Sequence, residues 1–173
     1  MELKPALAGQ YHAGLAMLRQ CIDRCPDDLW VSGSHPRTYW RIAYHAIFYT
    51  HLYLMPNLEA FKPWEKAIEN DASLWDDDPD GVPPAEPVYT KEEMLGYLDQ
   101  VDAQIDGWVE GLDLDALHTG FDWYPIPKLD HQLMNLRHVQ GHLGQLSELM
   151  MARGIDIDWI AVPPNRKNLH LTS

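Results

Sequence analysis

Apolar residues recur along most of the chain at the three- and four-residue steps that are typical of amphipathic α-helices. Four stretches carry this pattern, at about residues 5–25, 36–54, 90–112 and 130–153. The stripe of the first stretch is Leu7, Tyr11, Leu15, Leu18, Ile22 and Cys25. The stripe of the third is Met94, Leu98, Val101, Ile105, Trp108 and Leu112. The pattern predicts an all-α protein built from four helices.

Local signals mark several helix ends. Pro26-Asp27-Asp28 ends the first helix, and Ser34-His35-Pro36 has the cap and the first-turn proline of a helix start. Thr90 and Glu93 form a capping-box pattern at the start of the third helix. Gly154 is expected to stop the fourth helix.

The segment at residues 55–89 is long for a connection inside a compact domain and is rich in Pro, Asp and Trp. Such a length indicates a functional loop or a crossover. A short helix at 58–68 is one option, although Pro63 argues against its continuity. Residues 76–81 superficially resemble a calcium loop, but the twelfth position is Pro87 instead of glutamate, so we interpret them as a solvated acidic loop.

We therefore expect a single domain of residues 1–173, a four-helix bundle with a long crossover between its second and third helices. Residues 155–173 lack a helical period and contain Pro163-Pro164, which predicts an irregular C-terminal tail that packs as an irregular strand or an extended arm.

Composition limits the function. The net charge of -13 disfavours a nucleic-acid surface, which needs clustered Lys and Arg, and also an anionic membrane surface. We find neither a signal peptide nor an apolar run near the ~20 residues of a membrane span. The only cysteines are Cys21 and Cys25, whose helical spacing does not suit a disulfide. A cytoplasmic location is expected.

Histidines supply the candidate chemistry. His138 and His142 are four residues apart on the fourth helix, so their side chains lie within about 40° of each other around the axis. His45 lies in the middle of the apolar stripe of the second helix. If these helices face each other, three imidazoles converge on a site for Zn²⁺, Ni²⁺ or a similar ion. Three protein ligands leave an open position, which is typical of catalytic sites.

A simpler interpretation competes with this one, because a histidine on an apolar face is often a hydrogen-bonded core residue. Cys21 and Cys25 could be metal ligands or a redox pair, but we expect them to be small apolar core residues. Gln145 could touch a substrate, orient a ligand or satisfy a buried backbone group. Tyr49 is mainly a core ring, and the alternative is that its hydroxyl reaches the pocket. We interpret the other six histidines as structural or surface residues: His12, His35, His51, His118, His131 and His170.

Residues 136–146 (LRHVQGHLGQL) resemble the helix-four signature of the DinB-like (DinB/YfiT) metalloprotein superfamily, and residues 40–50 (WRIAYHAIFYT) resemble its helix-two motif. Residues 121–124 (FDWY) also match. The resemblance implies a homodimeric four-helix bundle that binds a divalent metal through His45, His138 and His142. Gly141 departs from the pattern, since many relatives have a histidine there.

Some members of this superfamily use low-molecular-weight thiols as transferases or isomerases. The resemblance thus implies a metal-dependent thiol S-transferase acting on a small-molecule substrate, with the metal lowering the pKa of the thiol. A metal-dependent hydrolase is one alternative. A non-catalytic bundle that binds a small molecule or partner is another. No catalytic residue beyond the metal ligands can be assigned from the sequence.

Overall fold

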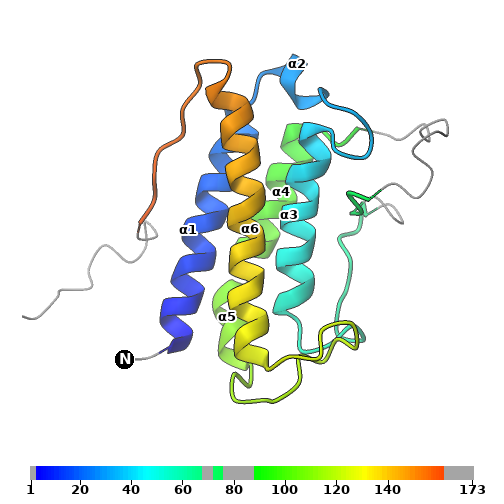
Figure 1. Ribbon diagram of the computed structural model, residues 1–173, viewed down its shortest axis with the longest axis vertical. Helices are drawn as coiled ribbons and strands as arrows, with labels where there is room; N and C mark the ends of the chain where they lie inside the picture. Colours follow the sequence, from blue (N-terminus) through cyan, green and yellow to red (C-terminus); the bar gives the residue numbers. More distant parts are fainter. Residues whose placement is uncertain (1–2, 68–71, 76–87, 162–173) are drawn as a thin grey trace, which may run out of the picture.

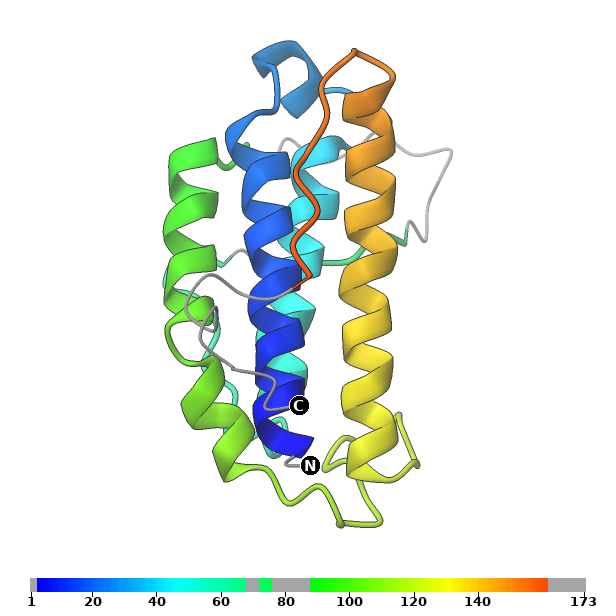
Figure 2. The ribbon, with the colours of Figure 1, turned by 90° about the vertical axis from the view of Figure 1, so that its left-hand side faces the viewer.

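The computed structural model describes residues 3–67, 72–75 and 88–161. Regular secondary structure in these residues is entirely helical, and none of them forms a β-strand. The long helices α1 (Leu3–Asp23), α3 (Tyr39–Leu54) and α6 (Lys128–Met151) run side by side (Figure 1). Beside them, α4 (Lys91–Asp102) and α5 (Ile105–Gly111) follow one another along the same direction (Figure 2). The all-α prediction is confirmed.

The helices enclose one apolar core. Helix α6 packs against both α1 and α3, while α1 and α3 each pack against α4 and α5. Burying these apolar stripes stabilises the fold by roughly 1.5–3 kcal/mol for each large side chain removed from water. The largest fully buried side chains of this core include Tyr11, Tyr39, Tyr44, Tyr97, Leu15, Leu18, Ile22 and Met94. The contact between α3 and α6 determines the site described below.

The prediction of one continuous helix at 90–112 is wrong, because the structure has two helices there, α4 and α5. The Thr90–Glu93 capping box is present, with both reciprocal hydrogen bonds formed. The helix then breaks between α4 and α5, where the Gln104 N–H donates to the carbonyl of Val101 at 3.1 Å in a tighter turn. Apolar periodicity continues through the break, because Ile105 and Val109 are still buried. Periodicity alone could therefore not detect it.

The second predicted helix begins three residues later than expected. Residues Ser34 to Arg37 form a turn in which the Arg37 N–H donates to the Ser34 carbonyl at 2.7 Å. Thr38 is extended, and α3 begins at Tyr39. A short helix that the pattern did not predict, α2 (Asp27–Trp30), buries Leu29 and Trp30.

The remaining helix ends are within two residues of the prediction. Helix α1 spans Leu3–Asp23 instead of 5–25, and α6 spans Lys128–Met151 instead of 130–153. Gly154 has a φ of 74°, a left-handed conformation that suits glycine after a helix.

The segment after α3 has no helix in its described part. Instead it forms turns, in which the Phe61 N–H donates to Leu58 and the Ala67 N–H donates to Trp64. The option of a helix at 58–67 is therefore wrong, and Pro63, which lacks an N–H, lies between the two turns. The acidic loop predicted at 76–81 lies outside the described residues.

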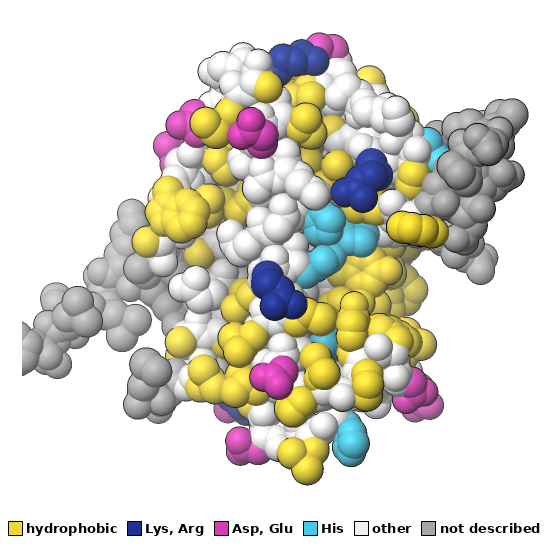
Figure 3. Space-filling view, viewed as in Figure 1, with side chains coloured by type: hydrophobic (Ala, Val, Ile, Leu, Met, Phe, Trp, Pro, Cys, Tyr) yellow, Lys and Arg dark blue, Asp and Glu magenta, His cyan; other side chains and the backbone are white. Residues whose placement is uncertain are grey.

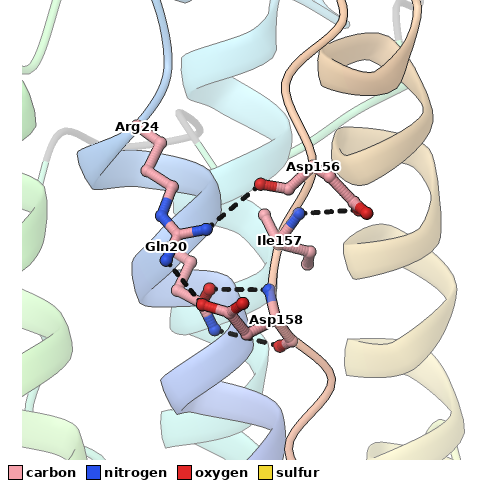
Figure 4. A network of polar contacts seen from close by, with 5 residues as sticks. All are labelled: Gln20, Arg24, Asp156, Ile157 and Asp158. Atoms are coloured by element: carbon pink, nitrogen blue, oxygen red, sulfur yellow. Dashed lines mark hydrogen bonds and ion pairs between the residues drawn. The ribbon is translucent and has the colours of Figure 1, made fainter.

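The described part of the C-terminal tail has no helix or strand and runs along α1 (Figure 2). Gln20 and Arg24 hold it there through Asp156 and Asp158 (Figure 4). In the closest of these contacts the Arg24 guanidinium lies 2.7 Å from an Asp158 carboxylate oxygen. Through these exposed polar contacts the described part of the tail lies as an extended arm against α1.

Candidate metal centre

Three imidazoles converge where α3 faces α6. The Nε2 atom of His138 lies 2.8 Å from Nε2 of His45 and 3.1 Å from Nε2 of His142. The three rings offer ligand atoms that all lie within 4.8 Å of one another. Helical periodicity places His138 and His142 on the same face of α6, and the packing of α3 on α6 brings His45 next to them. The predicted three-histidine cluster is thus present.

Hydrogen bonds at the far side of two rings fix where their protons lie. Nδ1 of His45 lies 2.6 Å from the carbonyl oxygen of Ala72, which can only accept, so Nδ1 carries the proton. Nδ1 of His142 likewise donates to Oε1 of Gln145 at 2.9 Å. In the neutral rings both Nε2 atoms therefore present lone pairs toward His138.

The third ring cannot satisfy both lone pairs. A proton on Nε2 of His138 could bond to only one of the two facing nitrogens. The other contact would then place two lone pairs face to face. Nδ1 of His138 is buried and has no hydrogen-bond partner among the described residues. With its proton on Nδ1, His138 would present a third unprotonated Nε2, and three such nitrogens are electrostatically suited to a cation at their centre.

The spacing also suits a metal ion. Two nitrogens bound to one tetrahedral Zn²⁺ at about 2.0–2.1 Å lie about 3.3 Å apart. The observed 2.8 and 3.1 Å are slightly shorter, so small rotations of the rings would admit the ion. Burial lowers the pKa of His45 to about 3 and that of His138 to about 4, and it also lowers the pKa of His142. Metal ligation needs this neutral form.

A cavity of about 390 Å³ opens beside the cluster. His45 and His138 are two of the residues that line it. The remaining lining side chains are Tyr49, Tyr53, Tyr124, Met134 and Arg137. Figure 3 shows histidine side chains at the surface on the face over α3 and α6, so a ligand can reach them from solvent. The cluster thus has three protein ligands and an accessible side.

The electrostatic surroundings of the cluster are positive. Arg137 lines the cavity, and the charge of Arg37 lowers the pKa of both His45 and His142. Figure 3 shows basic side chains on two sides of the histidine patch. Among the described residues, neither Asp nor Glu lines this cavity. The cavity therefore contrasts with the acidic protein around it.

Gln145 and Tyr49 contact the histidine cluster, whereas the two cysteines lie in the core. Gln145 does orient a ligand candidate, through His142. Tyr49 packs against the rings of both His45 and His138 and lines the cavity, so it belongs to the site as well as to the core. Cys21 and Cys25 are buried free thiols of the core, as expected.

The other described histidines lie outside the cluster. His51 stacks on Trp108 with ring centroids 4.9 Å apart, and His12 is buried against Asp102 with Nδ1 2.8 Å from a carboxylate oxygen. His131 is fully buried among aromatic rings, so its interpretation as structural holds and a surface position is wrong. His118 is exposed, and His170 lies outside the described residues.

Sequence reasoning missed several contributors to the site. The carbonyl of Ala72 comes from the crossover, and Tyr53 and Tyr124 come from the end of α3 and the loop before α6. Only the position of Tyr53 one turn beyond Tyr49 on α3 gave any sign of the aromatic wall.

Comparisons with known proteins add no relative. A scan against protein-family models, a search of curated proteins and a search of solved structures find no match to this chain. Among the described helices, none combines the length and the apolar character needed to cross a membrane.

Proposed function

We propose that this protein is a DinB-like four-helix bundle that binds one divalent metal ion, Zn²⁺ or Ni²⁺, through His45, His138 and His142. The observation that carries the proposal is the convergence of three Nε2 atoms, two of which are left unprotonated by hydrogen bonds at Nδ1. Imidazole ligands suit both ions, and the family resemblance of the two motifs agrees with this choice.

The proposed reaction is transfer of a low-molecular-weight thiol to a small electrophile. A divalent ion held by three imidazoles lowers the pKa of a thiol at its remaining position. The thiol sulfur forms a bond to the electrophilic carbon, the leaving group departs with its bonding electrons, and the thiol proton passes to solvent. Burial raises the pKa of Tyr49, so its hydroxyl stays protonated and can donate a hydrogen bond to the substrate.

The cavity lining favours thiol transfer over hydrolysis. A thiol with an ordinary pKa near 8.5 needs little assistance to ionise, whereas water needs much more. Hydrolases often add a carboxylate as general base. Among the described residues, neither Asp nor Glu lines the cavity.

Elemental analysis of the purified protein tests the metal. We expect about one equivalent of Zn or Ni per chain, or uptake of one equivalent after treatment with a chelator. An empty site that does not respond to added metal would overturn the proposal. Turnover of an electrophile with glutathione, mycothiol or bacillithiol tests the reaction, and turnover that proceeds equally without thiol would favour hydrolysis. Absence of turnover by the metal-loaded protein, both with and without a thiol, would favour a non-catalytic binding role.

Two further features belong to the proposal. A cytoplasmic location agrees with the free thiols of Cys21 and Cys25. A homodimer is implied by the family resemblance, and sedimentation analysis of the purified chain tests it.

A further inference from the structure

Arg137 has no partner in the described part of the chain. It lies on α6 directly before His138, is exposed, and lines the cavity beside the histidine cluster. It forms neither a hydrogen bond nor an ion pair with any described residue. Its helical neighbours three and four positions away are all uncharged, so α6 offers it no ion pair. These neighbours are Leu133, Met134, Gln140 and Gly141.

Arg137 has no ion pair with a described residue although the protein is acidic. The chain has 26 acidic residues against 13 Lys and Arg. Other described cations do contact a carboxylate, as the pairs Arg24–Asp158, Lys66–Glu93, Lys91–Asp27 and Arg153–Asp28 show. Arg137 is thus a guanidinium free to bind an anion, at a cavity that Asp and Glu of the described residues do not line.

The rest of the cavity indicates the shape of that anion. Tyr49, Tyr53 and Tyr124 provide aromatic surface, and the volume of about 390 Å³ is at the small end of ligand pockets. Tyr49 packs against the His45 ring with centroids 4.6 Å apart, so the aromatic surface reaches the histidines. A ligand that fills the cavity would therefore contact Arg137, aromatic rings and the histidine cluster together.

We propose that the cavity binds a small organic carboxylate with a flat apolar body. The carboxylate pairs with Arg137, the body packs against the tyrosines, and the reactive end lies toward His45 and His138. Arginine suits this role because its planar fork can donate two parallel hydrogen bonds to one carboxylate. The orientation of the reactive end rests on the proposed metal function, whereas the contact with Arg137 does not.

The test compares para-toluate with para-methylbenzyl alcohol, which have the same ring and differ in the carboxylate. Affinities are measured by ligand-observed NMR titration on zinc-loaded and on chelator-treated full-length protein. We expect the wild type to prefer para-toluate by at least about fivefold in both forms, as for a charge-assisted contact at a partly exposed site. Arg137→Gln should abolish the preference, and Arg137→Lys should retain part of it.

Lys62→Gln is the matched control. It removes one positive charge from an exposed position that does not line this cavity, and it should leave the preference unchanged. Equal affinity of the wild type for the two probes, no binding of either, or a preference that survives in Arg137→Gln would each overturn the proposal. A preference for para-toluate that is seen only in the zinc-loaded protein would also overturn the proposal, because the metal would then bind the carboxylate. Failure of zinc to bind at all would overturn the proposed function alone.

Discussion

The Nε2 atoms of His45 and His138 lie 2.8 Å apart, although the two residues are 93 positions apart in the sequence. Ala72, which lies in the crossover between α3 and α4, accepts the Nδ1 proton of His45. The crossover that follows α3 therefore orients one of the candidate ligands. This arrangement allows each part of the site to be tested separately.

Removal of one candidate ligand should empty the site. In His138→Ala the cluster loses the nitrogen that faces both other rings, and we expect metal content to fall at least about tenfold. Elemental analysis after gel filtration measures it. His118→Ala removes an exposed histidine elsewhere and should retain the metal. Metal retained by His138→Ala would contradict the ligand assignment.

The hydrogen bond from His142 to Gln145 should tune metal affinity. Gln145→Leu leaves Nδ1 of His142 without its acceptor, and the loss should weaken metal binding by about 10- to 100-fold. A competition titration with a chromogenic chelator measures the change. Gln140→Leu is the control, because Gln140 is exposed on the same helix and forms no hydrogen bond with the described residues. An equal loss in both variants would point to a general effect on α6.

Acid should destabilise the protein partly through His131. Burial lowers the pKa of this ring to about 4, and neither ring nitrogen has a hydrogen-bond partner among the described residues. Between about pH 6.5 and 4 the unfolded chain binds a proton that the folded chain does not, so stability falls as the pH is lowered. The slope from this one group is at most about 1.4 kcal/mol per pH unit.

His131→Leu tests this effect. The variant should lose that part of the slope while remaining folded at pH 7, since the site is walled by aromatic rings such as Tyr53 and Phe121. Urea unfolding of the chelator-treated protein across this pH range measures the difference between wild type and variant. Identical slopes would show that His131 does not carry the proton linkage.

Substitution by alanine should change the free energy of unfolding in opposite directions at Gly120 and at Gly141. Gly120 has a φ of 84°, and an added Cβ would collide with the Pro56 carbonyl oxygen, so Gly120→Ala should lower the free energy of unfolding by at least about 2 kcal/mol. Gly141 lies within α6 with nothing within 4 Å of an added Cβ. Gly141→Ala should therefore raise the free energy of unfolding by about 0.8–1 kcal/mol. Urea denaturation measures both.

Gly141→Ala also bears on the site. It lies directly before His142 at the position where many DinB-like proteins are expected to have a histidine. The small methyl group should leave metal binding unchanged, because no described atom beyond its chain neighbours and the backbone of its own helix lies within 4 Å of the added Cβ. A loss of metal in the stabilised variant would indicate that α6 must bend near Gly141 for the site to form.

The amino-acid sequence by itself determined the long helices and placed two of the three histidines of the cluster on one face. Apolar periodicity predicted the long helices, the Thr90–Glu93 capping box placed the start of α4, and the spacing of His138 and His142 put both rings on one face. These features could be predicted because each depends on interactions within one or two helical turns.

Only the tertiary structure decided the rest. The packing of α3 on α6 joined His45 to the pair, and the fold of the crossover and of the loop before α6 supplied Ala72 and Tyr124. The break after Asp102 was also invisible to periodicity, because the residues beyond it remain buried. Contacts between distant segments depend on how all the helices fill the core together, and no local pattern records that choice.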